Sequence, residues 1–360
     1  MNINNINNIT ITTIIAFLCV QLFIFKPALD KKDSVTNSFI KASQEYIKKI
    51  EVRGEKRIVI IGNGPIFNEK GEALPFQDSA IIDPLREKLA RDNYTVITMS
   101  LPCLEPECNS HYFNLGLAAL SLNPEAIILH AISSGLNTDT LDQLFTESET
   151  PVYIYGRELP INYRLYVGPD NNRLGLNLAE GILPEIEPGD NILYVETVRL
   201  LNGDITDNGF TRINPVRRLL NKAGTNEVDT LFTYWSKTNT YEQINAVLAQ
   251  GKKVDYIVTP SVETAEGAIE AVRQRNLQDE IKILSLDFNP RIKELIEEGS
   301  LYATTSQEFY RQSGALAAAI ESQIESQITV TPGSKKRFAS GLITKDNLNN
   351  FIDGEGNYLY

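Results

Sequence analysis

The sequence predicts an α/β fold of two doubly wound lobes, each a mostly parallel sheet with helices on both faces. Short apolar runs alternate with longer segments of helical periodicity, which is typical of parallel strands joined by right-handed helical crossovers. The alternation begins near residue 57 and starts again after residue 160. A chain of 360 residues is long enough for two such cores and too long for one.

The first lobe is predicted to comprise residues 55–160 and 288–330. Arg57–Ile61 is a continuous apolar run bounded by glycine, as expected of a parallel strand that is buried on both faces. Further strands are predicted at 94–99, 126–129 and 152–155, and helices at 79–90, 114–122 and 140–145.

The second lobe is predicted to comprise residues 161–287 and 331–360. Its strands are expected at 191–195, 230–234, 256–258 and 282–286, and its helices at 174–183, 210–223, 241–248 and 264–274. Asp170 lies in the cap region of the first of these helices. A short helix, a strand at 301–305 and a helix from residue 313 follow. We expect the chain to cross between the lobes near 158–164, 287–291 and 328–334.

The N-terminal residues predict export. Residues 9–25 carry no charge and are mostly apolar, with a length between that of a signal-peptide core and that of a minimal membrane span. Lys26, Lys31 and Lys32 follow this run. We therefore expect residues 1–33 to be a signal or anchor segment and the protein to be periplasmic or extracytoplasmic, tethered through residues 9–25. The sequence leaves open whether the segment is cleaved.

A helix is predicted at residues 34–54, between the apolar run and the first strand. Phe39, Ile40, Tyr46 and Ile50 form its apolar face. Two surfaces can cover that face, the body of the protein and the membrane surface, and the sequence does not choose between them.

The composition excludes several classes of function. The net charge of −12 and the absence of a basic stripe argue against a nucleic-acid partner, because such binding depends on neutralising phosphates. Two histidines and three cysteines leave little material for a metal site, so no cofactor is expected. Gly62–Gly64 lacks the lysine of a phosphate loop, and no Gly-x-Ser-x-Gly motif is present, so we do not expect an enzyme.

Cys103 and Cys108 lie five residues apart in a segment flanked by prolines. The spacing could hold a metal, but no second Cys or His pair completes a set of four ligands. A local disulfide is the preferred interpretation and requires an oxidising compartment. Two free thiols are the alternative.

Three segments in this order resemble the type 1 periplasmic solute-binding proteins, the class of the ribose and galactose receptors. They are 166–175 (YVGPDNNRLG), 265–272 (AEGAIEAV) and 283–289 (ILSLDFN) followed by 296–307 (IEEGSLYATTSQ). The resemblance covers most of residues 57–345. It implies two Rossmann-like lobes joined by a three-strand hinge, and a receptor without catalytic activity.

A weaker similarity links the chain to periplasmic furanosyl-autoinducer receptors that partner sensor kinases. It is carried by 164–170 (RLYVGPD), 192–195 (ILYV) and 342–345 (LITK), together with the helix before the first strand. This subgroup similarity does not establish the ligand.

The ligand site is expected where loops follow the carboxyl ends of strands, since ligands bind there in doubly wound sheets. Phe76 offers an aromatic face for a sugar ring, and Arg157 a planar fork for oxygen atoms. By resemblance, Asp287 and Gln307 match ligand-contacting positions of the family. The full set of predicted ligand-binding residues is Phe76, Gln77, Arg157, Ser261, Glu263, Asp287 and Gln307.

The chain departs from the resembled pattern at two places. Ser133 and Ser134 stand where sugar receptors carry an acid, and residues 204–208 hold no arginine ahead of Gly209-Phe210. Ribose is therefore not the expected ligand. A borate-diester anion, considered because of the furanosyl-signal receptors, would lack the arginine that is expected to bind it. His130 could serve as a base near the two serines, but no orienting acid is identifiable, so a structural or ligand-lining role is favoured.

Together these observations predict a monomeric exported receptor that closes on a sugar or sugar-like small molecule. It would present this ligand to a membrane partner, either an ABC transporter permease or a sensor kinase. The alternative is a cytosolic ligand-responsive regulator that lacks a recognisable DNA-binding domain.

We predict that Cys103 and Cys108 are bonded to each other in the exported protein, with Cα atoms within about 7 Å. The closed loop is short, so the bond constrains the unfolded chain little and its effect on stability is small. Mass spectrometry after alkylation of the native protein tests this. Two alkylated thiols in freshly isolated protein would contradict it.

Overall fold

The computed structural model describes residues 56–63, 78–91, 94–101, 108–130, 138–197, 208–328 and 330–351. The chain divides into two compact units, which we call unit 1 (Met1–Val167 with Leu316–Lys335) and unit 2 (Gly168–Ala315 with Lys336–Tyr360). It passes from one unit to the other three times, after Val167, Ala315 and Lys335. Each unit contains one six-stranded sheet, so the predicted α/β fold with two sheets is confirmed.

The sheet of unit 1 has the strand order β11-β5-β4-β3-β1-β2. In chain order its strands are β1 (Arg57–Asn63), β2 (Thr95–Leu101), β3 (Ala126–Leu129), β4 (Val152–Tyr155), β5 (Leu165–Pro169) and β11 (Ser334–Phe338). The passages after Val167 and Lys335 fall within β5 and β11, whose remaining residues are assigned to unit 2. The pairs β1–β2, β1–β3, β3–β4 and β4–β5 are parallel. Every residue of β3 and β4 is buried, which explains why these strands read as continuous apolar runs.

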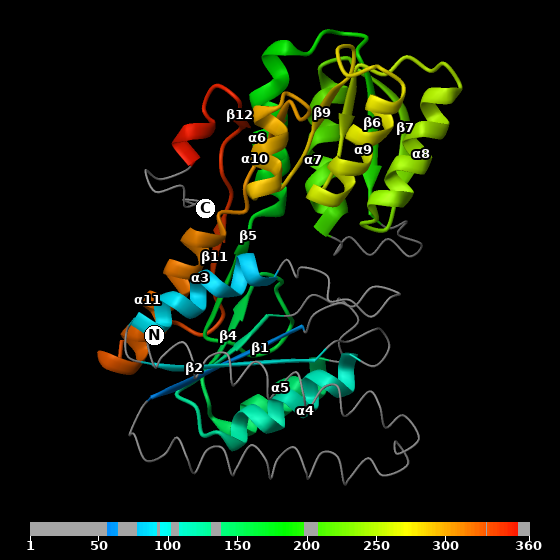
Figure 1. Cartoon of the computed structure of the whole chain (residues 1–360). Helices are drawn as coiled ribbons and strands as arrows, with labels where there is room; N and C mark the ends of the chain where they lie inside the picture. The colour runs from blue at the N-terminus through cyan, green and yellow to red at the C-terminus, as the bar shows by residue number, and fades with distance from the viewer. Residues whose placement is uncertain are drawn as a thin grey trace, which may run out of the picture. The chain divides into compact units, whose positions relative to one another are not determined.

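Helices of unit 1 bury apolar stripes against this sheet. They are α3 (Asp78–Arg91), α4 (Cys108–Ser121), α5 (Thr138–Ser148) and α11 (Phe309–Glu325), which contains the second crossing after Ala315. Figure 1 shows α4 and α5 side by side on one side of the sheet. Their side chains Leu115, Leu141 and Phe145 share one core with Val59 and Ile127 of the strands.

The sheet of unit 2 has the order β12-β10-β9-β8-β6-β7. Its strands are β6 (Asn191–Glu196), β7 (Asn226–Phe232), β8 (Tyr256–Val258), β9 (Lys282–Leu284), β10 (Ala303–Thr304) and β12 (Ile343–Thr344). β12 runs antiparallel to β10, and the other pairs are parallel. A parallel sheet brings the carboxyl ends of its strands to one edge, and this edge of unit 2 holds most of the predicted site residues.

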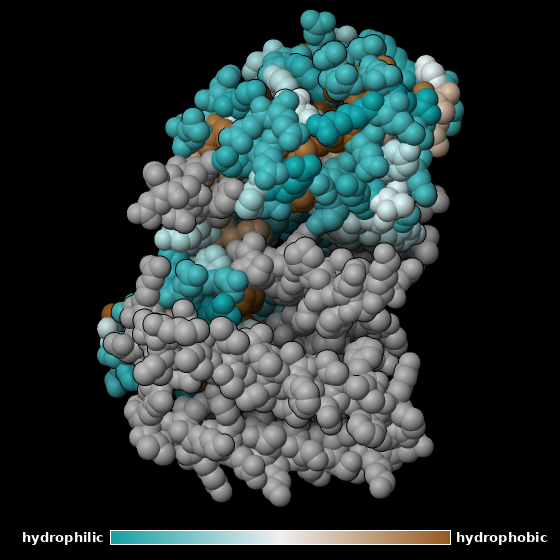
Figure 2. Space-filling view, viewed as in Figure 1, coloured by the Kyte–Doolittle hydropathy of each residue, from teal (hydrophilic) through white to brown (hydrophobic). Residues whose placement is uncertain are grey.

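Alternate residues of β6 enter two different cores of unit 2. Ile192 and Tyr194 pack with α6 (Asn171–Ile182) and α7 (Asn208–Lys222). Leu193 and Val195 pack with α8 (Lys237–Ala249), α9 (Val262–Gln274) and α10 (Pro290–Glu297). The 3-10 helices η3 (Leu183–Glu185) and η4 (Leu348–Phe351) complete the unit. Figure 2 shows its surface as largely hydrophilic, with hydrophobic residues visible mainly in recesses between helices.

The observed units differ from the predicted boundaries in three segments, 161–167, 288–315 and 331–335, the last of which belongs to unit 1. Residues 288–315 belong to unit 2, because Ala303 of β10 pairs with Leu284 of β9 and α10 packs into the core of that unit. Residues 161–167 belong to unit 1, because Leu165 of β5 pairs with Tyr153 of β4. Local periodicity identifies a strand but not the sheet that it joins. The chain crosses between the units after Ala315, and not near 287–291 as the sequence predicts.

Several predicted features lie outside the described residues. These are the segment 1–33, the helix 34–54, Phe76, Gln77, Cys103, Ser133 and Ser134. Cys108 begins α4, which starts six residues earlier than predicted. No helix among the residues that the structure describes is long and apolar enough to cross a membrane.

Two glycines of the family-like segments allow helices to pack closely. A Cβ at Gly175 of α6 would lie 2.1 Å from the carbonyl oxygen of Arg212 in α7. A Cβ at Gly267 of α9 would lie 2.4 Å from the carbonyl oxygen of Lys237 at the start of α8. Both distances are far below van der Waals contact, so neither position has room for a side chain.

We predict that Gly175→Ala destabilises the protein by about 1–3 kcal/mol, because the added methyl group forces α6 and α7 apart. The loss outweighs the gain of about 1 kcal/mol in helix propensity. Gly341→Ala is the matched control, since nothing lies within 4 Å of a Cβ at Gly341. Denaturant unfolding measures both, and equal midpoints for the two variants would refute the packing argument.

Candidate functional site

Four strands of unit 2 end in polar residues at the same edge of the sheet. Thr197 follows β6, Thr259–Ser261 follow β8, Ser285–Asp287 follow β9 and Thr305–Gln307 follow β10. Many of these side chains are buried although they are polar. Buried polar groups require hydrogen-bond partners, and the contacts among these residues supply them.

Asp287 and Gln307, both predicted site residues, are in direct contact. The Gln307 amide donates a hydrogen bond to one carboxylate oxygen of Asp287. The other carboxylate oxygen accepts from Arg212 Nη1 at 3.2 Å. The backbone of Asp287 is fixed as well, because its carbonyl accepts from Thr304 Oγ1 at 2.7 Å. Burial raises the pKa of Asp287, and the charge of Arg212 and the bond from Gln307 oppose that rise.

Arg212 joins the strand ends to α6, and the sequence argument missed it. Its Nε donates to Asn171 Oδ1 at 2.9 Å, and its Nη1 donates to the carbonyl oxygen of Pro260 at 2.9 Å and to that of Leu286 at 3.4 Å. Its side chain is only 5% exposed, against 17% for Asp287. An anchored guanidinium group therefore lies at the carboxyl edge of the unit 2 sheet, on a residue that follows Phe210 by two positions rather than preceding Gly209.

One sequence signal could have revealed this arginine. The buried residues of α7 are Gly209, Arg212, Ile213, Pro215, Val216 and Leu220. Arg212 thus occupies the apolar stripe of an amphipathic helix, where a charge requires a partner inside the fold. The resembled pattern places its arginine before Gly209-Phe210, whereas Arg212 follows these two residues.

Trp235 brings an aromatic ring to the same edge. Its ring centroid lies 6.0 Å from Cζ of Arg212. Tyr234 and Trp235 both have positive φ, 54° and 59°, which is costly for residues with bulky side chains. The corner is held by a bond from the Tyr234 N–H to the Thr197 carbonyl at 2.6 Å and by Ser236, the N-cap of α8. These contacts hold the strained corner and place the indole ring beside the guanidinium group.

Ser261 and Glu263, also predicted site residues, open α9. Ser261 is the N-cap of this helix and forms a capping box with Thr264. Its hydroxyl oxygen accepts a hydrogen bond from the Thr264 N–H in the first turn. Glu263 lies in the first turn. Burial and the nearby charge of Asp287 raise its pKa, whereas hydrogen bonds from its own backbone N–H and from Ser261 lower it. Contact of either residue with a ligand stays a prediction.

Asp170 and Asn171 organise the start of α6. Asp170 caps the helix by accepting from the Arg173 N–H at 2.9 Å, as its position in the sequence predicts. Asn171 accepts from Arg212 and donates to Asn208 Oδ1 at 3.1 Å. These contacts tie the first turns of α6 and α7 to each other and fix the direction of Arg212.

Arg157 belongs to unit 1, where it follows β4 and Gly156. Gly156 has a φ of +84°, and a Cβ there would lie 2.8 Å from the ring of His130. The His130 ring is buried, with Nδ1 2.9 Å from the carbonyl oxygen of Tyr155. His130 is therefore a buried residue of unit 1, in agreement with a structural role, which is one of the two roles that the sequence favoured for it.

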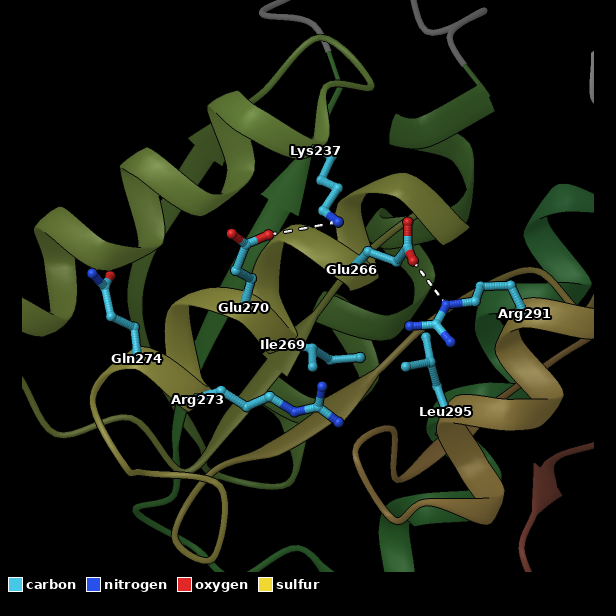
Figure 3. A pocket seen from close by; sticks show the side chains of 8 residues that line it. All are labelled: Lys237, Glu266, Ile269, Glu270, Arg273, Gln274, Arg291 and Leu295. Atoms are coloured by element: carbon cyan, nitrogen blue, oxygen red, sulfur yellow. Dashed lines mark hydrogen bonds and ion pairs between the residues drawn. The ribbon is translucent and has the colours of Figure 1, made fainter. Parts of the chain in front are cut away.

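A surface groove of about 490 Å³ runs along the outer face of α9, between α8 and α10 (Figure 3). Its charged groups pair across it, with Lys237 3.5 Å from Glu270 and Arg291 2.9 Å from Glu266. These exposed pairs link neighbouring helices, and none of the predicted ligand-binding residues that the structure describes lines the groove. Within the described ranges, no three His, Cys, Asp or Glu residues gather as a metal site would require.

Residues 118–327, more than half of the chain, match the family described as "Periplasmic binding protein domain". The chain belongs to this family of periplasmic binding proteins. The match contains β3 to β10 and every residue of the Arg212–Asp287–Gln307 network. The resemblance to type 1 periplasmic solute-binding proteins is thereby confirmed.

Known binding proteins share the fold at low sequence identity. A curated D-ribose/D-allose-binding protein of Pseudomonas aeruginosa is 21% identical over 181 residues, which are 50% of this chain and 53% of that protein. The chain thus matches about half the length of this relative. An ABC transporter solute-binding protein from Actinobacillus succinogenes with bound D-allose superposes with a TM-score of 0.68 at 17% identity, covering 82% of this chain and all of that one.

A solved complex, XylFII–LytSN, contains a further structural neighbour. Its matched chain has a TM-score of 0.64 and 19% identity, and the alignment covers 82% of this binding protein and 99% of that chain. A Bacillus halodurans solute-binding protein with bound myo-inositol gives a TM-score of 0.66 at 16% identity, covering 82% and 97%. At these identities the likeness establishes the shared fold.

We predict that Arg212→Met destabilises the binding protein by about 3–5 kcal/mol at neutral pH, because it leaves a buried carboxylate without its cation. Loss of Arg212 raises the folded-state pKa of Asp287 further. When the pKa of an acid is higher in the folded state than in the unfolded chain, protonation stabilises the folded state. This stability is fully present below the ordinary pKa, near 3.9, and is lost as pH rises through the folded-state pKa. The deficit of the variant therefore shrinks as pH falls from neutral, as denaturant unfolding at several pH values can measure.

The double variant Arg212→Met/Asp287→Asn is the control for this prediction. It removes the unpaired charge together with its partner and should recover part of the lost stability. A deficit that is independent of pH, or a double variant less stable than the single one, would contradict the charge-pair argument.

Proposed function

We propose that this protein is an exported receptor, without enzymatic activity, that binds a sugar or sugar-like small molecule at the carboxyl edge of the unit 2 sheet. The observation that carries the proposal is the hydrogen-bonded chain Gln307–Asp287–Arg212, which joins two strand ends and α7 within one unit. Trp235 adds an aromatic ring beside the guanidinium group. Membership of the periplasmic binding protein family supports the proposal and its extracytoplasmic location.

The chemistry of the network suits polyhydroxylated ligands. Sugars need groups that accept and donate hydrogen bonds to adjacent hydroxyls, and a flat apolar face against the C–H groups of the ring. Asp287 accepts hydrogen bonds, Arg212 donates them, and Gln307 can do both. Because these groups already hold one another, they are oriented before the ligand arrives, which reduces the entropic cost of binding.

The charge balance of the network favours a neutral ligand. The positive charge of Arg212 is offset by Asp287, and Glu263 adds a further acid close by. A phosphate or carboxylate would meet no uncompensated cation among these residues and would be repelled by the acids. We therefore expect a neutral polyol. Ligand contacts of Phe76, Gln77 and Arg157 stay sequence-based predictions, since these residues belong to unit 1 and the first two lie outside the described residues.

Known proteins of similar fold support the proposed class of ligand and of partner. Structural neighbours are solved with bound D-allose and with bound myo-inositol, both neutral polyols. Another neighbour is solved in a complex with LytSN. We propose that this receptor, a monomer, presents its ligand to a membrane partner, either an ABC transporter permease or a sensor kinase.

A panel of neutral sugars and cyclitols, with phosphorylated and carboxylated sugars alongside, tests the ligand class by thermal shift of the full chain. A true ligand at 100 times its dissociation constant stabilises the folded protein by about 2.7 kcal/mol. We expect stabilisation by a neutral compound and none by the anions. Stabilisation by anionic sugars alone would overturn the charge argument.

With that ligand, Asp287→Ala and Gln307→Ala are each expected to weaken binding about ten- to hundredfold, equivalent to 1.5–3 kcal/mol. Calorimetry measures the affinities. Glu270→Ala is the matched control, because Glu270 is an exposed acid of the α9 groove, and it should bind like the parent protein. Parent-like binding by both site variants would show that the ligand binds elsewhere.

A further inference from the structure

Five consecutive polar residues, at and just after the end of β10, are buried. They are Thr304, Thr305, Ser306, Gln307 and Glu308, with exposed fractions between 0% and 8%. A buried polar run is costly unless its hydrogen-bonding groups are paired inside the fold. Because the run contains Gln307 of the candidate site, the groups that pair with it also determine how that site is held.

The turn that leads from this run into α11 is strained. Glu308 has a φ of 59°, in the left-handed region, which is unfavourable for a residue with a Cβ. Its N–H donates to Ser306 Oγ at 3.0 Å, and its carboxylate forms an ion pair of 2.7 Å with Arg311. The Ser306 N–H in turn donates to Ser340 Oγ at 2.6 Å. Side chains therefore hold this turn in its strained conformation.

Gln312, a fully buried residue in the first turn of α11, bonds to the same segment twice. Its backbone N–H donates to the Glu308 carbonyl at 3.0 Å, and its side-chain Nε2 donates to the Gln307 carbonyl. The Gln307 side chain donates to Asp287. Gln307 is thus held at its carbonyl by Gln312 and at its side-chain amide by Asp287. With both ends fixed, few rotamers of Gln307 remain.

Stability alone does not explain an amide at position 312. Oε1 of Gln312 is buried and has no hydrogen-bond partner among the residues that the structure describes. An unpaired buried oxygen is costly, and a methionine would fill a similar space without that cost. The Nε2 of the same amide bonds to Gln307, so what the amide contributes is the placement of that residue.

We propose that Gln312 is a positioning residue of the candidate site: it fixes the backbone of Gln307 and so keeps the Gln307 amide directed at Asp287. Gln312 needs no contact with the ligand for this role. Without it, Gln307 gains rotamers that binding has to freeze again, which weakens binding. The effect on affinity rests on the sugar-binding role proposed above, whereas the placement of Gln307 does not.

NMR of the ligand-free full chain, with isotope-labelled glutamine, tests the placement. The side-chain amide signals of Gln307 are identified by their absence from Gln307→Ala. In Gln312→Met these amide protons should exchange with solvent at least about tenfold faster than in the parent, because the released side chain loses its bond to Asp287. Gln323→Met makes the same change in the last turn of α11, in unit 1, and should leave the Gln307 signals unchanged.

Calorimetry with myo-inositol and D-allose as probes tests the effect on affinity. These are the polyols bound by two structural neighbours. Gln312→Met should weaken the binding of a probe about three- to tenfold, and should cause no further loss in the Gln307→Ala background. This coupling separates positioning from a merely structural role, which would lower stability and leave the affinity independent of the residue at 307.

Backbone amides of β9 report whether each variant folds. Gln312→Asn, which keeps an amide but shortens the side chain by one methylene group, replaces Gln312→Met if the latter does not fold. Unchanged exchange of the Gln307 amide, or an equal loss of affinity with and without Gln307, would overturn the proposal. A parent protein that binds neither probe would count against the sugar-binding role, and the exchange measurement would still decide the placement of Gln307.

Discussion

Parallel strands place their carboxyl ends at one edge of a sheet, and in unit 2 one guanidinium group ties those ends together. Arg212 reaches the carbonyl groups that follow β8 and β9 and the carboxylate of Asp287, which in turn binds Gln307 after β10. Four elements are thus fixed relative to one another by a single side chain. The candidate site depends on this interaction more than on any individual ligand contact.

The position of Arg212 depends in turn on helix packing. Gly175 lets α6 approach until its Cα lies against the backbone carbonyl of Arg212, and Asn171, one turn earlier in α6, holds the Nε of the same arginine. Backbone and side chain of Arg212 are therefore both positioned by α6. A buried ion pair contributes little net stability against its desolvation cost, so its retention here is better explained by geometry than by stability.

The charged groups of the α9 groove differ from this buried network. Across the groove, acids and bases form exposed pairs, and such pairs contribute little to stability. Arg212 and Asp287, by contrast, form their ion pair in a largely buried position, where each depends on the other for its partner.

The sequence by itself determined the α/β class and the two sheets, because burial periodicity and turn chemistry are local properties, and its resemblance to the family pointed to Asp287 and Gln307. It also identified Asp170 as a cap for the same reason. Only the tertiary structure decided that β10 joins the second sheet and that Arg212 and Trp235 reach the site. Those outcomes depend on strand order and on helix crossing at Gly175, which bring together residues that are distant in the sequence.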